Sequence, residues 1–178
     1  MKPFLCLLCI AFPMHAHADP YYPQPPGHAE LLASRPDLAF TGWVTWEADF
    51  DLLERVNRNV NGSMAYRPDG NDIWGVGSDC EDYALRKLEA LLQAGVPRGA
   101  LRLAIARVDR RGHAVLVVRD EWILDNLHDE ILRRGKNGFR IEAWETDDGN
   151  WNPAGAFASL ADHLEWSGRP LGADPAIP

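Results

Sequence analysis

A cysteine, a histidine and an aspartate have the order and spacing expected of a nucleophilic catalytic site. Cys80 lies where an amphipathic helix is expected to begin, and His113 and Asp125 fall on two consecutive strand-like segments. A thiol attacks acyl groups only as a thiolate, which is scarce at neutral pH when the thiol pKa is near its ordinary value of about 8.5. A helix N-terminus and a neighbouring imidazole both favour the thiolate. The three residues therefore predict thiol-dependent acyl transfer.

The segments that carry His113 and Asp125 are expected to pair as a hairpin. A three-residue turn centred on Arg119 would make the two residues direct cross-strand neighbours, and other turns would shift the pairing by about one residue. In each of these registers the carboxylate could orient the imidazole. Asn126 is the alternative orienting residue, because an amide carbonyl can also hold an imidazole. Taken singly, a lone cysteine is more often a small buried hydrophobe, so the prediction rests on the combination.

The helix that begins near Cys80 is the best-defined element in the sequence. Apolar residues recur at helical spacing through residue 94, Asp79 is a suitable N-cap, and Gly95 followed by Pro97 ends the helix. Other helical patterns cover residues 29–40, with an interruption at Pro36, and residues 47–60, and a loop is expected over residues 67–78. Strand-like sequence follows at residues 101–107, 113–118, 121–127 and, weakly, 139–144. Helices followed by antiparallel strands predict an α+β fold in which a helix packs on a sheet.

Length and composition indicate one globular domain. The chain has 178 residues, of which 46% are hydrophobic and 25% charged. Its formal charge of -8 argues against a nucleic-acid-binding surface, because phosphate contacts require Lys and Arg. Of its 3 cysteines, Cys6 and Cys9 lie in the N-terminal segment, so Cys80 has no partner for an internal disulfide once that segment is removed.

The first 18 residues have the pattern of a signal peptide. A positively charged start is followed by an apolar run over residues 4–12, and Ala16 and Ala18 supply the small residues that precede cleavage. The run is shorter than the roughly 20 residues that a membrane span needs. We therefore expect export to the periplasm and no membrane-spanning segment. The expected organisation is a signal peptide over residues 1–18, an extended leader over 19–28, the folded domain over 29–167 and a loose tail over 168–178.

Three blocks of sequence resemble the bacterial transglutaminase-like cysteine peptidases, which include the periplasmic LapG-type proteases. The blocks are 79–84 (DCEDYA), 112–117 (GHAVLV) and 123–127 (ILDNL), and the resemblance covers roughly residues 43–127. It implies a papain- or transglutaminase-like fold with the nucleophile at a helix N-terminus. It also implies that Cys80 is the nucleophile, that His113 is the general base and acid, and that Asp125 orients the imidazole.

Acidic residues on both sides of Cys80 raise a specific question. Asp79, Glu81 and Asp82 would increase the pKa of the thiol, so they must point away, pair with cations or bind a metal. Carboxylate oxygens suit calcium, and the resemblance implies calcium dependence through Asp79 and Glu81, with Asp82 as a possible third ligand. The alternative is helix capping without a metal. A second acidic segment over residues 69–72 is interpreted as turn chemistry, and residues 128–130 as a solvated turn.

These observations favour an exported cysteine endopeptidase. Two other functions remain open: transfer of the acyl group to an amine at the same site, as in a transglutaminase, and a catalytically inactive, calcium-responsive binding module. The resemblance implies that the substrate is a cell-surface adhesin and that a membrane-bound cyclic-di-GMP receptor sequesters the enzyme. Trp74 and Trp122 are expected to lie in the core or to line a cleft near the site.

Overall fold

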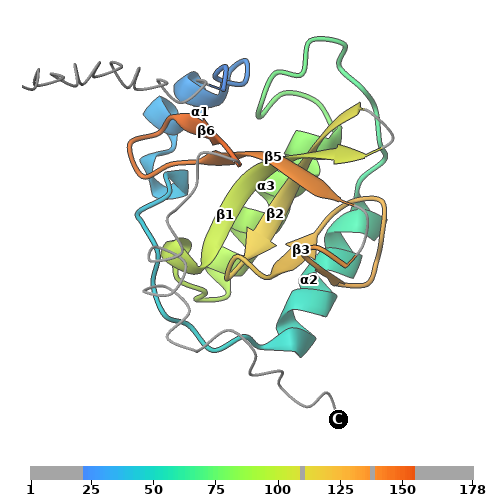
Figure 1. The fold of residues 1–178 in the computed structure, drawn as a ribbon. Helices are drawn as coiled ribbons and strands as arrows, with labels where there is room; N and C mark the ends of the chain where they lie inside the picture. Colours follow the sequence, from blue (N-terminus) through green and yellow to red (C-terminus); the bar gives the residue numbers. More distant parts are fainter. Residues whose placement is uncertain (1–21, 109–110, 137–138, 155–178) are drawn as a thin grey trace, which may run out of the picture.

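An antiparallel sheet forms the centre of the molecule (Figure 1). The computed structural model describes residues 22–108, 111–136 and 139–154, and in this part of the chain six strands have the order β4-β3-β2-β1-β5-β6. The strands are β1 (Leu101–Val108), β2 (Arg111–Val118), β3 (Trp122–Leu124), β4 (Leu132–Arg133), β5 (Arg140–Glu145) and β6 (Trp151–Pro153). They follow the helices α1 (His28–Ser34), α2 (Phe50–Ser63) and α3 (Cys80–Gln93) and the 3-10 turns η1 (Pro36–Leu38) and η2 (Arg98–Ala100). This order confirms the predicted α+β fold.

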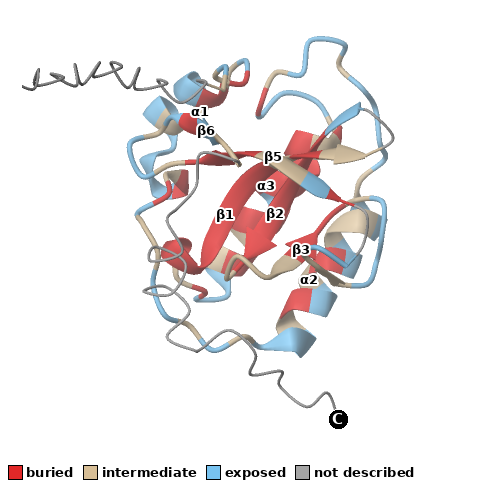
Figure 2. Ribbon diagram, viewed as in Figure 1, coloured by how far each residue is buried: buried red, intermediate tan, exposed pale blue. Residues whose placement is uncertain are grey.

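Helix α3 packs on one face of the sheet, mainly against β2. Ala114, Leu116 and Val118 of β2 share a hydrophobic core with Leu88 and Leu91 of α3. The alternate residues of β2 belong to a smaller cluster on the other face. Burial on both faces explains the continuous apolar run of this strand, and Figure 2 shows the central strands as buried. The core therefore fixes the first residue of α3, Cys80, relative to β2.

The helices begin and end close to where the sequence predicts. Helix α3 covers almost all of the expected range and has Asp79 as its N-cap. Helix α1 ends at Ser34 and Pro36 begins η1, so the expected interruption is present, because proline disfavours helical backbone at the residue before it. Helix α2 begins at residue 50 instead of 47, because the Asp49 carboxylate accepts a hydrogen bond of 3.0 Å from the Leu52 N–H and caps the first turn.

The β2–β3 hairpin differs from its expected register. Leu116 pairs with Leu124 and Val118 pairs with Trp122, so the three turn residues are centred on Asp120 and not on Arg119. Both Asp120 and Arg119 have positive φ, which tightens this turn. Continuing this register places residue 125 opposite residue 115, which is two positions from His113. The expectation that His113 and Asp125 are direct cross-strand neighbours is therefore wrong, and the two residues are diagonal neighbours. Strands β4 and β6 were not expected, since two or three residues give no alternation that could be recognised.

The segment before α1 is packed against the rest of the domain. The Gln24 side chain donates a hydrogen bond of 3.1 Å to the carbonyl of Gly149, and His28 is fully buried with its ring 5.2 Å from those of Trp74 and Trp151. An unpacked leader was expected because its Pro- and Tyr-rich sequence has no periodicity. Trp74, expected in the core or lining a cleft, belongs to the hydrophobic core.

The predicted signal peptide and the predicted C-terminal tail lie outside the described residues. Within the part of the chain that is described, no helix is sufficiently long and apolar to cross a membrane. The division of the chain into a signal, a leader, a domain and a tail therefore stays a prediction.

Candidate active site

Cys80 is the first residue of α3, where the backbone N–H groups of a helix favour negative charge. Its surroundings act in the opposite direction. Burial, followed by the charges of Glu81 and Asp79, raises the pKa of the thiol to about 12, although the backbone N–H of Ala114 partly offsets the rise. The thiol donates a hydrogen bond of 3.2 Å to Glu81 Oε2. Burial and the neighbouring acids therefore both oppose formation of the thiolate in this arrangement.

His113 and Asp125 form a buried pair. His113 Nε2 lies 3.5 Å from Asp125 Oδ2, and the side chains are 9% and 0% exposed. Burial alone would raise the pKa of Asp125, but the interactions with His113 and His128 outweigh it and lower the pKa. The diagonal register explains the pair, because residues two apart on a strand point to the same face of the sheet. His113 directly precedes Ala114, whose N–H adjoins the Cys80 thiol.

The pairing also decides which nitrogen of His113 can act as a base. An ionised carboxylate only accepts hydrogen bonds, so the nitrogen that faces Asp125, Nε2, carries the proton. In the neutral imidazole the other nitrogen, Nδ1, is then unprotonated. The His113 ring held by Asp125 is therefore in the tautomer that can accept a proton at Nδ1.

Two asparagines of α2 hold the loop that carries Asp125. Asn61 Nδ2 donates to the carbonyl oxygens of Asp125 and His128 at 3.1 and 3.0 Å, and Asn57 Nδ2 donates to the carbonyls of His128 and Asp129 at 2.9 Å each. These contacts fix the backbone directly after β3, where the strand ladder has ended.

Asn126 was the alternative to Asp125 for orienting His113. Its Oδ1 is buried and has no hydrogen-bond partner among the described residues. The carboxylate of Asp125 is the group that faces the His113 ring.

Four carboxylates gather at the start of α3. One oxygen from each of Asp69, Asp72, Asp79 and Glu81 lies within 4.8 Å of the others. The β-bridge that pairs residue 67 with residue 78 closes the loop between them and brings its acids to the helix. The interpretation of residues 69–72 as turn chemistry is therefore incomplete. The Asp69 carboxylate does accept hydrogen bonds from the N–H groups of residues 71 and 72, and it also joins this cluster.

The four carboxylates fit a bound cation. Asp79 Oδ1 and Glu81 Oε1 are buried and have no hydrogen-bond partner among the described residues. Burial and the neighbouring Asp79 carboxylate raise the pKa of Glu81 to about 7, because negative charge is crowded there. Carboxylate oxygens from flexible loops are typical ligands of calcium. Asp82, the possible third ligand, instead accepts a hydrogen bond of 3.4 Å from the Asp79 N–H, and its role as a ligand stays a prediction.

Comparison with protein families gives residues 40–153 a clear assignment. This part of the chain matches the family described as bacterial transglutaminase-like cysteine proteinase BTLCP. The chain belongs to this family. It is therefore a cysteine peptidase, and its substrate is a protein.

Solved structures of Legionella pneumophila LapG have the same fold as this cysteine peptidase. The calcium-bound form matches with a TM-score of 0.53 and 24% identity, and covers 74% of this chain and 78% of its own. The EGTA-treated form matches with a TM-score of 0.50 and 22% identity over 79% of this chain and 83% of its own. No match was found among curated proteins. The family and the fold agree with the resemblance that the sequence showed.

Two residues of the site were not identified from the sequence. His128, interpreted as part of a solvated turn, contacts Asp125 with both its ring Nδ1 and its backbone N–H. Lys87 of α3 is fully buried, and its Nζ has no hydrogen-bond partner among the described residues. Burial lowers the pKa of Lys87 to about 7, against the attraction of Asp125 and Asp129. The helical spacing could have indicated the burial of Lys87, because it lies four residues after Tyr83 and four before Leu91 and so shares their face of α3.

We expect the substitution Lys87→Met to stabilise the protein by about 1 kcal/mol or more at pH 7, since it removes a buried, unpaired ammonium group. The pKa of Lys87 is near 7 in the folded state and about 10.4 in an unfolded chain. The unfolded chain therefore binds more protons between these values, and the stability of the wild type rises with pH through that range.

Urea unfolding at pH 7 and pH 9 would measure both effects. The rise with pH should be smaller in Lys87→Met and unchanged in the matched control Lys136→Met, because Lys136 is exposed. A Lys87→Met variant less stable than the wild type at pH 7 would contradict this account of Lys87.

Proposed function

We propose that the chain is an exported cysteine endopeptidase in which Cys80 is the nucleophile, His113 the general base and acid, and Asp125 the orienting carboxylate. The observation that carries the proposal is the buried contact of 3.5 Å between His113 Nε2 and Asp125 Oδ2. His113 directly precedes Ala114, and the backbone N–H of Ala114 adjoins the thiol of Cys80 at the start of α3. Membership of a cysteine proteinase family supports the same assignment.

The reaction would proceed through a thioester. As His113 Nδ1 takes the thiol proton, the Cys80 sulfur forms a bond to the peptide carbonyl carbon, and the negative charge moves to the carbonyl oxygen. The backbone N–H of Cys80 would donate to that oxygen at the helix N-terminus. His113 then returns the proton to the leaving amine as the C–N bond breaks, and water, deprotonated by the same imidazole, hydrolyses the thioester. Asp125 stabilises the imidazolium and stays ionised.

We further propose that Asp69, Asp72, Asp79 and Glu81 hold calcium. Their clustered oxygens and the two unpartnered buried atoms support this, as does the fold shared with the calcium-bound form of LapG. Bound calcium supplies positive charge that offsets the carboxylates beside the thiol. Ligation by Glu81 would also engage the carboxylate that now accepts the thiol hydrogen bond. The thiol would then be free to donate to His113.

The proposed cellular role rests on the sequence. The signal-peptide pattern of residues 1–18 supports export and a periplasmic location. The resemblance to LapG-type proteases supports a cell-surface adhesin as the substrate and a membrane-bound cyclic-di-GMP receptor as a partner.

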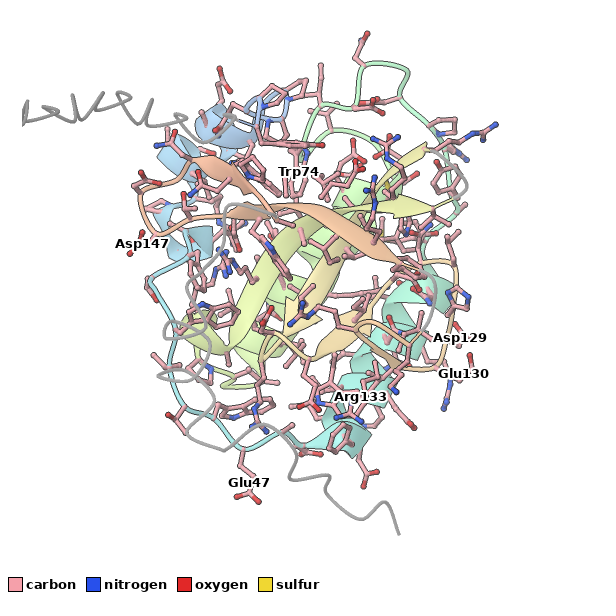
Figure 3. All side chains as sticks on the ribbon, viewed as in Figure 1. Glu47, Trp74, Asp129, Glu130, Arg133 and Asp147 are labelled. Carbon is pink, nitrogen blue, oxygen red and sulfur yellow. The ribbon has the colours of Figure 1, made fainter. Side chains whose placement is uncertain are left out.

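The peptidase assignment predicts cleavage of a surface protein from the same organism by the purified mature chain in calcium. Cys80→Ser should abolish cleavage, and Asp125→Asn should lower kcat/KM by at least about a hundredfold, since it removes the charge that stabilises the imidazolium. Asp147→Asn is the matched control, because Asp147 is exposed on the other side of the molecule from Asp129 in Figure 3. Incorporation of a labelled amine without cleavage would replace the peptidase assignment with amine transfer.

Removal of calcium is expected to destabilise the protein. A ligand that binds only the folded state stabilises it, so excess calcium should raise the melting temperature by about 5 °C over EGTA. Asp72→Asn should reduce this gain because it removes a ligand, while Asp147→Asn should keep it. Thermal melts followed by circular dichroism give the comparison, and equal melting temperatures of the wild type in calcium and in EGTA would defeat the calcium proposal.

A further inference from the structure

The carboxylate of Asp125 is shared by two histidines. On one side His113 Nε2 faces Oδ2 at 3.5 Å. On the other side His128 Nδ1 lies 3.2 Å from Oδ1 and 3.3 Å from Oδ2, and the His128 backbone N–H donates to Oδ1 at 3.0 Å. The contacts of His128 with the Asp125 carboxylate are therefore shorter than that of His113, although His128 takes no part in the proposed reaction.

The charge of Asp125 fixes how His128 must bind it. Because the interactions with both histidines keep the pKa of Asp125 below its ordinary value, the group is an ionised carboxylate that can only accept hydrogen bonds. His128 Nδ1 must then carry the proton and donate it. The ring Nδ1 and the backbone N–H of His128 thus supply two hydrogen-bond donors to the Asp125 carboxylate. Asp125 directly follows β3, so strand pairing does not hold its backbone.

His128 also covers Asp125. The Asp125 side chain is 0% exposed, whereas that of His128 is 43% exposed, so the imidazole lies on the solvent side of the buried carboxylate. The His128 ring and the His113 ring each pack against Phe139 with their centroids 5.8 Å from its own. Asn57 and Asn61 hold the backbone of His128 through its carbonyl oxygen. Its neighbours Asp129 and Glu130 lie at the outer edge of the molecule beside α2 (Figure 3).

We propose that His128 is a positioning residue, which binds Asp125 from the solvent side and keeps the carboxylate facing His113. The proposal rests on the proposed role of Asp125 and His113 in catalysis. His128 does not touch the reacting atoms: it acts through Asp125, by fixing the orientation of the carboxylate and excluding water from it. Other groups that face Asp125 are Lys87 from α3, through its charge, and Asn61 from α2, through the backbone carbonyl.

The test separates the ring donor of His128 from its bulk. His128→Asn keeps an N–H donor the same number of bonds from the backbone, whereas His128→Leu fills similar space without a donor. The first measurement is the rate at which iodoacetamide alkylates Cys80 in the calcium-loaded mature chain. The second is the proton NMR signal of the His113 ring N–H, which exchanges slowly only while a buried acceptor holds it.

We expect His128→Leu to slow alkylation by about tenfold and to lose the slowly exchanging His113 signal, since a charge-assisted hydrogen bond is lost. His128→Asn should stay within about twofold of the wild type and keep the signal. A residue that only stabilises the fold would change the melting temperature and leave both readouts unmoved. If His128→Leu does not fold, His128→Ala replaces it, because alanine removes the ring without adding bulk.

Asp125→Asn separates the two ways in which the proposal could fail. If Asp125→Asn slows alkylation but His128→Leu does not, the positioning role of His128 is wrong and the triad stands. If neither Asp125→Asn nor His113→Ala changes the rate, the triad itself is wrong, and the role of His128 falls with it. A His128→Asn variant as slow as His128→Leu would also overturn the proposal.

Discussion

The uncompensated negative charge at the start of α3 is the constraint on which the site depends. The helix places Cys80 where a thiolate is favoured, but burial, followed by the charges of Glu81 and Asp79, raises the thiol pKa to about 12. Asp69 and Asp72 bring two more carboxylates to the same place. Among the described residues, no ion pair joins a cationic side chain to Asp69, Asp72, Asp79 or Glu81. A cation held by these four acids would offset their charge beside the thiol, as the proposed function requires.

The pKa values of two buried carboxylates in the site, Glu81 and Asp125, are shifted in opposite directions. Burial and the neighbouring Asp79 carboxylate raise the pKa of Glu81 to about 7, whereas two imidazoles lower the pKa of Asp125. Carboxylates whose environments push their pKa values apart are suited to different roles. In the proposed mechanism Glu81 belongs to the group that would hold a cation, and Asp125 is the carboxylate that would stabilise a protonated imidazole.

The sequence predicted the local parts of this arrangement well. The amphipathic pattern and the Asp79 cap identified α3 and placed Cys80 at its first residue, and the strand-like segments brought His113 and Asp125 to one hairpin. The exact register was not predictable. It depends on the conformation of the turn, in which Arg119 and Asp120 both have positive φ.

The parts that the sequence did not predict arise from contacts between distant segments. Asp69 and Asp72 look like ordinary turn residues until the bridge between residues 67 and 78 folds their loop onto α3. His128 looks like a surface residue until α2 fixes its backbone beside Asp125. Lys87 lies on the same face of α3 as Tyr83 and Leu91. Because lysine is rarely buried, its burial becomes evident only from the packing of α3.

The most direct test of the central claim is the rate of alkylation of Cys80 by iodoacetamide at neutral pH, measured in calcium and in EGTA. If a cation neutralises the acids and frees the thiol for His113, calcium should accelerate alkylation by at least about tenfold, and His113→Ala should lose most of that gain. Equal rates in calcium and EGTA, or an equal gain in His113→Ala, would contradict the account.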